Sequence, residues 1–169
     1  KPKIPEIKYK TGKKISKKDL PKSLRIAVRD IGGQGNLFFG KVLSELALRT
    51  PYSDMHIVKG DTHGMAQLGG PVISVFCCGD VFSPVLAPSS VDILVAMEIN
   101  EVLRPGFIDL IKPGGTIIFN DFKALPVNAK KSEYPNFNKI KKELKANKIL
   151  ISDFYKLAYE LGDIKGLTA

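Results

Sequence analysis

A glycine-rich turn between a short apolar strand and an amphipathic helix constrains the fold of this chain more than any other feature. Residues 24–28 form an apolar run typical of a buried strand, and the turn Gly32-Gly33-Gln34-Gly35 follows shortly after it. A helix is expected next, and Thr50 and Pro51 end it. Such a strand–turn–helix unit predicts an α/β domain. The residues that approximate one apolar face of the helix are Leu37, Val42, Leu43, Leu46 and Ala47.

Further short apolar runs alternate with helical segments along the chain. Near-continuous runs such as residues 93–97 are typical of strands covered on both faces of a sheet. The alternation predicts a three-layer α/β/α domain around a mostly parallel, mixed sheet. Strands are predicted at 24–28, 56–58, 72–78, 93–97, 116–119 and 149–152, with a short one around 81–82 and a turn at 112–115. Helices are predicted from Asn100 to Ile111, interrupted at Pro105 and Gly106, and at 137–148 and 154–161.

The glycine-rich turn admits two interpretations. Helix N-termini carry unpaired N–H groups and a partial positive charge, so Gly32, Gly33, Gln34 and Gly35 suit a phosphate or carboxylate. A tight turn that needs glycine only for packing explains the same residues. Phe38 stands where the dinucleotide motif G-x-G-x-x-G needs its last glycine, and no Gly-Lys-Ser/Thr follows. The turn is therefore neither that motif nor a P-loop.

Residues 60–70 form a second candidate loop. Four glycines lie here together with Asp61, Thr62, His63 and Gln67, and the segment has no apolar pattern of its own. Functional loops carried by a rigid scaffold have this composition. His63 can exchange a proton near neutral pH or simply form hydrogen bonds, and Gln67 can orient a ligand but cannot act as an acid or base. His56 lies within a strand pattern, which favours a structural role.

The positive charge of the chain is confined to two flanking segments. The formal net charge is +9, of which residues 1–22 carry +7 and residues 130–148 carry +5, so the remainder is mildly acidic. Lysine dominates both segments, whereas nucleic-acid readout and bidentate phosphate contacts favour arginine. We therefore expect no nucleic-acid partner. Residues 1–22 are predicted to be a Lys-rich linker or docking arm, and residues 23–169 the globular domain.

Cysteine usage and the chain ends give further expectations. Cys77 and Cys78 are adjacent, so in a strand they point to opposite faces and cannot bridge each other. Two buried thiols favour a reducing, cytoplasmic compartment and cannot supply a metal or iron–sulfur site alone. No apolar stretch approaches the roughly 20 residues of a membrane span, and the Lys-rich start is unlike a secretory signal. The absence of an initial Met and the polar end at 164–169 predict that the natural chain is longer.

The motifs together resemble the gamma domain of the 2-oxoacid:ferredoxin oxidoreductases, and most closely the beta subunit of indolepyruvate ferredoxin oxidoreductase. The resemblance covers about residues 24–162. Each motif is weak alone, but their order and spacing are specific. They are Ile31-Gly32-Gly33-Gln34-Gly35-Asn36, His63-Gly64-Met65-Ala66-Gln67-Leu68-Gly69-Gly70, Val81-Phe82-Ser83-Pro84, Val91-Asp92-Ile93-Leu94-Val95-Ala96 and Leu110-Ile111-Lys112-Pro113-Gly114-Gly115-Thr116.

The resemblance implies one part of a larger enzyme that is inactive alone. Such enzymes use thiamine diphosphate with Mg²⁺, 4Fe–4S clusters and coenzyme A to oxidise a 2-oxoacid, and they pass the electrons to ferredoxin. The resemblance to the indolepyruvate enzyme implies an aryl, indolepyruvate-like 2-oxoacid as the substrate. The gamma domain holds no redox centre, packs against the subunit that carries thiamine and iron–sulfur clusters, and helps form the coenzyme A approach. The implied contact residues are Gly32, Gly33, Gln34, Gly35, Asn36, Thr62, His63, Gly64, Met65, Gln67, Gly69 and Gly70.

Two departures from the family pattern keep other functions open. Asp30 stands where the family has glycine, and its carboxylate opposes an anion at short range. Leu68 stands where the family has arginine, so the second loop lacks a fixed positive charge. Both residues favour a purely architectural domain of a redox complex. A standalone nucleotide- or coenzyme-binding module is the remaining alternative.

Overall fold

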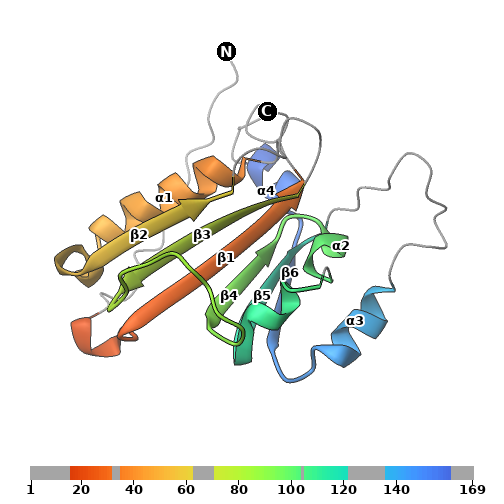
Figure 1. The fold of residues 1–169 in the computed structure, drawn as a ribbon. Helices are drawn as coiled ribbons and strands as arrows, with labels where there is room; N and C mark the ends of the chain where they lie inside the picture. Colours follow the sequence, from red (N-terminus) through yellow and green to blue (C-terminus); the bar gives the residue numbers. More distant parts are fainter. Residues whose placement is uncertain (1–15, 32–34, 63–70, 104, 122–135, 161–169) are drawn as a thin grey trace, which may run out of the picture.

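The computed structural model describes residues 16–31, 35–62, 71–103, 105–121 and 136–160, which form one mixed six-stranded sheet with helices on both faces (Figure 1). The strand order is β2-β3-β1-β4-β5-β6. The strands are β1 (Ser23–Ile31), β2 (His56–Asp61), β3 (Pro71–Gly79), β4 (Val91–Ala96), β5 (Ile111–Asn120) and β6 (Lys148–Ser152). The helices are α1 (Asn36–Leu48), α2 (Ile99–Val102), α3 (Phe137–Glu143) and α4 (Phe154–Glu160), with 3₁₀ turns η1 (Lys17–Asp19), η2 (Pro51–Asp54) and η4 (Ile108–Leu110).

The direction of each strand follows from the length of its connection. The neighbouring pairs β1–β4, β4–β5 and β5–β6 are parallel, while β3 runs antiparallel to both β1 and β2. A parallel pair needs a long crossover, usually through a helix, but only the short segment 62–70 joins β2 to β3. The chain therefore reverses there. This confirms the predicted mixed sheet and α/β class.

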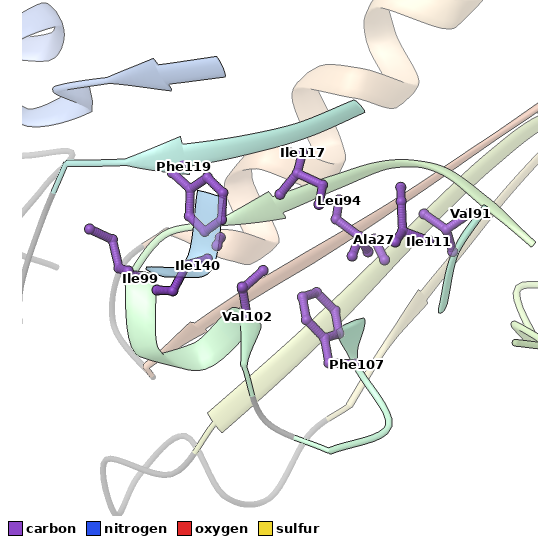
Figure 2. Packing of buried hydrophobic residues seen from close by; sticks show 11 residues of the cluster. Ala27, Val91, Leu94, Ile99, Val102, Phe107, Ile111, Ile117, Phe119 and Ile140 are labelled. Atoms are coloured by element: carbon purple, nitrogen blue, oxygen red, sulfur yellow. The ribbon is translucent and has the colours of Figure 1, made fainter. Parts of the chain in front are cut away.

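Two hydrophobic clusters fill the space between the sheet and the helices. On one face, α2 and α3 cover the middle of the sheet, and Ile99, Val102 and Ile140 lie around Phe119 (Figure 2). The ring of Phe119 meets that of Phe137 edge-on, with centroids 5.4 Å apart. On the other face, α1, η2 and α4 pack over Ile26, Val28, Phe76 and Val95. The predicted three layers are thus present.

Several element boundaries differ from the sequence predictions. Residues 81–82 form no strand. The exposed ring of Phe82 meets the His56 ring of β2 at a tilted angle, with centroids 4.4 Å apart. The predicted turn at 112–115 belongs to β5, whose register with β4 shifts between Val91 and Ile93. The helix expected from Asn100 is the single turn α2, because the segment around Pro105 and Gly106 separates it from η4. The predicted helix at 137–148 ends at Glu143 because β6 begins at Lys148.

The described end of the Lys-rich segment lies against the domain. Leu20 packs at the margin of the α1-side cluster, and the Tyr52 hydroxyl donates a 2.8 Å hydrogen bond to the carbonyl of Pro21. The backbone of Asp80 donates to the carbonyl of Lys22 at 2.8 Å. The last residues before β1 are therefore held by side-chain packing and hydrogen bonds. No helix in the described ranges has the length and apolar character to span a membrane.

Both cysteines are buried free thiols in β3. Cys78 packs in the α1-side cluster, and its adjacent neighbour Cys77 points to the opposite face. Burial raises the pKa of the Cys78 thiol to about 11, with smaller contributions from Cys77 and Asp92. Burial also raises the pKa of the Cys77 thiol. At neutral pH both sulfurs therefore stay protonated, which confirms the prediction of two small apolar core residues.

Candidate functional site

The first glycine-rich loop leaves the sheet beside the point where the second returns to it. Ile31 ends β1 just before the first loop, Pro71 begins β3 just after the second, and these two residues are direct partners in the antiparallel register. The Cα atoms of such partners lie about 4.5 to 5.5 Å apart. The first loop therefore begins, and the second loop ends, at the carboxyl end of β1. Nine predicted contact residues lie in the loops, outside the described residues: Gly32, Gly33, Gln34, His63, Gly64, Met65, Gln67, Gly69 and Gly70.

Gly35 and Asn36 join the first loop to helix α1. Gly35 is the N-cap and has φ 83° and ψ 18°, a left-handed conformation that costs a residue with a side chain about 1–2 kcal/mol. No side chain caps the helix there, and Asn36 is its first residue. The N–H groups of the first turn are therefore not capped by a side chain of the N-cap residue, and this helix terminus carries a partial positive charge. These properties fit the predicted anion-binding role.

Thr62 closes the base of the second loop. Its hydroxyl accepts a hydrogen bond from the Ile73 backbone N–H at 2.9 Å and donates one to the Ile73 carbonyl at 3.1 Å. Its own backbone N–H also donates to that carbonyl, at 2.9 Å. Next to it, the Asp61 carboxylate accepts a hydrogen bond from the Ser74 hydroxyl and pairs with Lys59, whose Nζ lies 2.8 Å from Oδ2. Thr62 thus fixes where the second loop begins and ends.

The same edge of the sheet is a topological switch point. β1 and β4 are parallel neighbours, but β1 leads to α1 on one face and β4 leads to α2 on the other (Figure 1). Open α/β sheets bind their ligands in the crevice outside the carboxyl ends of such strands. Hydrogen bonds join the strand ends: the Met97 N–H donates to the Arg29 carbonyl at 3.0 Å. Asn120 Nδ2 donates to the Met97 carbonyl at 3.1 Å, and Asn120 Oδ1 accepts from the Phe154 N–H at 2.9 Å.

Charged residues are buried beneath this edge. Arg29 Nε lies 2.9 Å from Glu101 Oε2, and the side chains are only 10% and 4% exposed. The guanidinium also lies over the ring of Phe107, with Cζ 5.3 Å from the centroid. Asp30 and Glu98 are each 1% exposed. Asp30, the departure from the family pattern, therefore lies in the interior and forms contacts there.

Arg29, Glu101 and Asn120 are not among the site residues predicted from the sequence. Arg29 and Asn120 each follow an apolar strand run directly, which is their only signal in the sequence. Glu101 has no such signal, and nothing in the sequence pairs it with Arg29, 72 positions away. Among the described residues, no group of three or more His, Cys, Asp or Glu side chains is placed to hold a metal ion. The described part of the site therefore consists of a helix terminus, two anchored loop ends and a buried ion pair.

Comparison with known proteins identifies the family. The family model of pyruvate ferredoxin/flavodoxin oxidoreductase matches residues 25–169. The chain belongs to this family. The family's "Indolepyruvate oxidoreductase subunit IorB" of Archaeoglobus fulgidus is 33% identical over 124 residues, covering 72% of this chain and 59% of the relative. The IorB subunit of Methanothermobacter thermautotrophicus is 28% identical over 110 residues, covering 65% and 54%. The family predicted from the motifs is confirmed, and the chain spans little more than half the length of these relatives.

Solved structures of the pyruvate ferredoxin/flavodoxin oxidoreductase type share the fold. Pyruvate oxidoreductase subunit PORC of Thermotoga maritima superposes with a TM-score of 0.58 at 22% identity, covering 88% of this chain and 71% of its own. The gamma subunit of a keto/oxoacid ferredoxin oxidoreductase from Geobacter sulfurreducens gives 0.52 at 17%, covering 87% and 78%. The 2-oxoglutarate:ferredoxin oxidoreductase of Magnetococcus marinus gives 0.53 at 17%, covering 83% of this chain but 22% of its own. The same fold thus occurs in a short subunit and within a long chain.

Proposed function

We propose that this chain is the non-redox-centre subunit or domain of a 2-oxoacid:ferredoxin oxidoreductase, and that it helps form the approach by which coenzyme A reaches the active site. The enzyme would oxidatively decarboxylate a 2-oxoacid to an acyl-CoA. The observation that carries the proposal is the register pair Ile31 and Pro71, because it joins the start of the first glycine-rich loop, which leads to α1, to the end of the second. Two loops and a helix N-terminus at one place suit a phosphate-bearing ligand.

Coenzyme A fits the residues of this edge. Its phosphates are anionic, and the backbone N–H groups of α1's first turn carry a partial positive charge. The left-handed Gly35 lets the backbone approach a ligand closely. Asp30 is 1% exposed and forms contacts inside the domain, so its carboxylate does not line the surface of this edge. The Magnetococcus marinus structure, named for bound 2-oxoglutarate, coenzyme A and succinyl-CoA, supports this ligand class for the fold.

Iron–sulfur clusters do not fit the thiols of this chain. Cluster ligands are thiolates, usually four cysteines per cluster. The chain has two, both buried, and burial raises the pKa of Cys78 to about 11. We therefore assign the clusters, and thiamine diphosphate with Mg²⁺, to partner subunits or domains. Electrons would pass to ferredoxin through the clusters of those partners. The IorB relatives favour an aryl 2-oxoacid such as indolepyruvate as substrate.

Native purification through a tag on this chain tests whether it assembles with a partner that carries thiamine diphosphate and iron–sulfur clusters. We expect a larger partner to be recovered, with iron and thiamine diphosphate present in the eluate and oxidation of 2-oxoacids in the presence of ferredoxin or a dye. The readouts are intact mass, iron content and thiamine content. An unrelated protein that carries the same tag controls for non-specific recovery. A clean monomer without iron or thiamine, under conditions that preserve complexes, would instead favour a standalone coenzyme-binding module.

Leu68→Arg in the whole enzyme tests the coenzyme A approach. The substitution adds the positive charge that the family pattern has in the second loop, so we expect the KM for coenzyme A to fall about three- to tenfold. Half-reaction rates without coenzyme A should stay unchanged. Ser53→Arg, on an exposed residue of η2 just before β2, adds the same charge at the end of β2 opposite to the second loop and should leave the KM unchanged. An unchanged KM in both variants would favour the architectural interpretation.

A further inference from the structure

Helix α1 exposes a row of large apolar side chains on its outer surface. Phe38, Val42 and Leu46 follow one another at intervals of four residues and are 68%, 38% and 54% exposed. The inner surface of the same helix is already packed, since Phe39, Leu43 and Ala47 contact the cluster over the sheet. The row therefore contributes nothing to the core of this domain. Contiguous exposed apolar side chains on a soluble domain mark a surface that another protein covers.

A second row runs beside the apolar one and creates a groove. Lys41, Glu45 and Arg49 also repeat every four residues, and a groove of about 240 Å³ lies between the two rows. Helices pack by inserting such an i±4 ridge of one helix into the groove between two rows of the other, at a crossing angle of about −50°. The shape of the groove is therefore that of a seat for one helix. Its six lining residues are Phe38, Lys41, Val42, Glu45, Leu46 and Arg49.

The charges of the second row indicate what kind of helix the groove would bind. Lys41 and Arg49 stand on either side of Glu45, so the row carries two cations and one anion. The two cations are eight residues apart, about 12 Å along the helix axis. A second copy of α1 would bring the same excess of positive charge, and the interface would then hold four cations against two carboxylates. Like net charge disfavours that pairing.

We propose that the α1 groove seats an amphipathic helix of the thiamine-bearing partner, with an apolar ridge in the groove and carboxylates that reach Lys41 and Arg49. This inference rests on the proposed function, because it names the surface through which the domain joins the enzyme. The groove begins at Phe38, three residues after Gly35, the N-cap at which the first glycine-rich loop joins α1. A helix seated on α1 therefore also brings the partner subunit to the coenzyme A approach.

Leu46→Glu in the tagged chain tests this surface by native purification. The substitution puts a carboxylate into the apolar row, and we expect recovery of the thiamine-bearing partner to fall at least about tenfold. Leu46 is exposed, so the melting temperature of the isolated chain should hardly change. Arg49→Glu should give a smaller loss that depends on salt concentration. The matched control is Val85→Glu, which changes a side chain that is 80% exposed outside α1 and should retain the partner fully.

The outcomes separate this inference from the proposed function. If the wild-type chain recovers the partner and Leu46→Glu recovers it equally, the groove is not the docking surface, while the subunit assignment stands. If the isolated wild-type chain is a dimer that Leu46→Glu dissociates, a second copy occupies the groove and the inference is wrong. If the wild-type chain brings no thiamine-bearing partner, the proposed function fails and the docking helix fails with it.

Discussion

Replacing Glu101 with leucine is expected to lower the free energy of unfolding by about 3 to 5 kcal/mol. Glu101 pairs with Arg29 at 2.9 Å, and both side chains are nearly inaccessible to solvent. Arginine keeps its charge at any pH that a folded protein tolerates. The variant would therefore leave a buried guanidinium beside Phe107 without its carboxylate partner. Because the pair lies beneath the carboxyl ends of β1 and β4, its loss should also make the backbone under the candidate site less rigid.

The double variant Arg29→Leu/Glu101→Leu separates the stability contributed by the ion pair from the cost of burying a single unpaired charge. Removing both charges avoids an unpaired ion, so we expect the double variant to be more stable than Glu101→Leu alone. Urea unfolding of the wild type, both single variants and the double variant completes the cycle. Glu160→Leu is the control, because Glu160 pairs with Lys156 at 4.0 Å on the surface and such pairs contribute about 0–1 kcal/mol. A loss below about 1 kcal/mol in Glu101→Leu would contradict the assigned burial.

The local units of the fold could be predicted because their signals are local. The run at 24–28, the glycines and the apolar spacing of the next helix lie within one stretch of chain, and β1 and α1 appear where they predict. The direction of β3 could not be read in the same way. It depends on which strand β3 pairs with, and the register that joins Ile31 to Pro71 links residues 40 positions apart. Alternation alone favours a parallel arrangement, and the short connection after β2 overrides it.

The apolar positions of α1 show the limit of periodicity. One apolar face was predicted from Leu37, Val42, Leu43, Leu46 and Ala47, and the structure describes the side chains of the last four. In the structure they form two: Leu43 and Ala47 face the sheet, whereas Val42 and Leu46 face outward. The prediction of one face was wrong because apolar residues cover more of this helix than one packed face needs. A sequence pattern cannot separate a core contact from a docking contact, since both bury apolar area.

The candidate site was predictable only in its composition. Glycine and polar residues identified both loops, and the structure places the described loop ends together at one edge. The ion pair of Arg29 and Glu101 had no such signal, because a charged residue after a strand is ordinarily expected at the surface. Asn120 was missed for a similar reason: its amide joins the ends of β4 and α4, which lie far apart in the sequence. The contacts of the loop residues themselves stay predictions.

Gly79→Ala is expected to lower the free energy of unfolding by at least about 3 kcal/mol. Gly79 ends β3 with φ +100°, where any residue with a side chain is strained. A Cβ atom at this position would overlap the carbonyl oxygen of Lys22 and come within 2.9 Å of the Ser23 Cα. Both are backbone atoms, so no side-chain rotation relieves the clash. Ser23 is also the register partner of Gly79, and the strain therefore falls on the β1–β3 pairing itself.

Gly106→Ala and Gly114→Ala isolate the clash from the conformational strain. Both glycines have positive φ, at +82° and +77°, and a Cβ at either position meets nothing within 4 Å. These variants should lose only the conformational cost of about 1–2 kcal/mol. The excess loss in Gly79→Ala then measures how tightly β3 holds residues 22 and 23, where the Lys-rich segment enters the sheet. Equal losses in all three variants, measured by urea unfolding, would show that this junction can move aside.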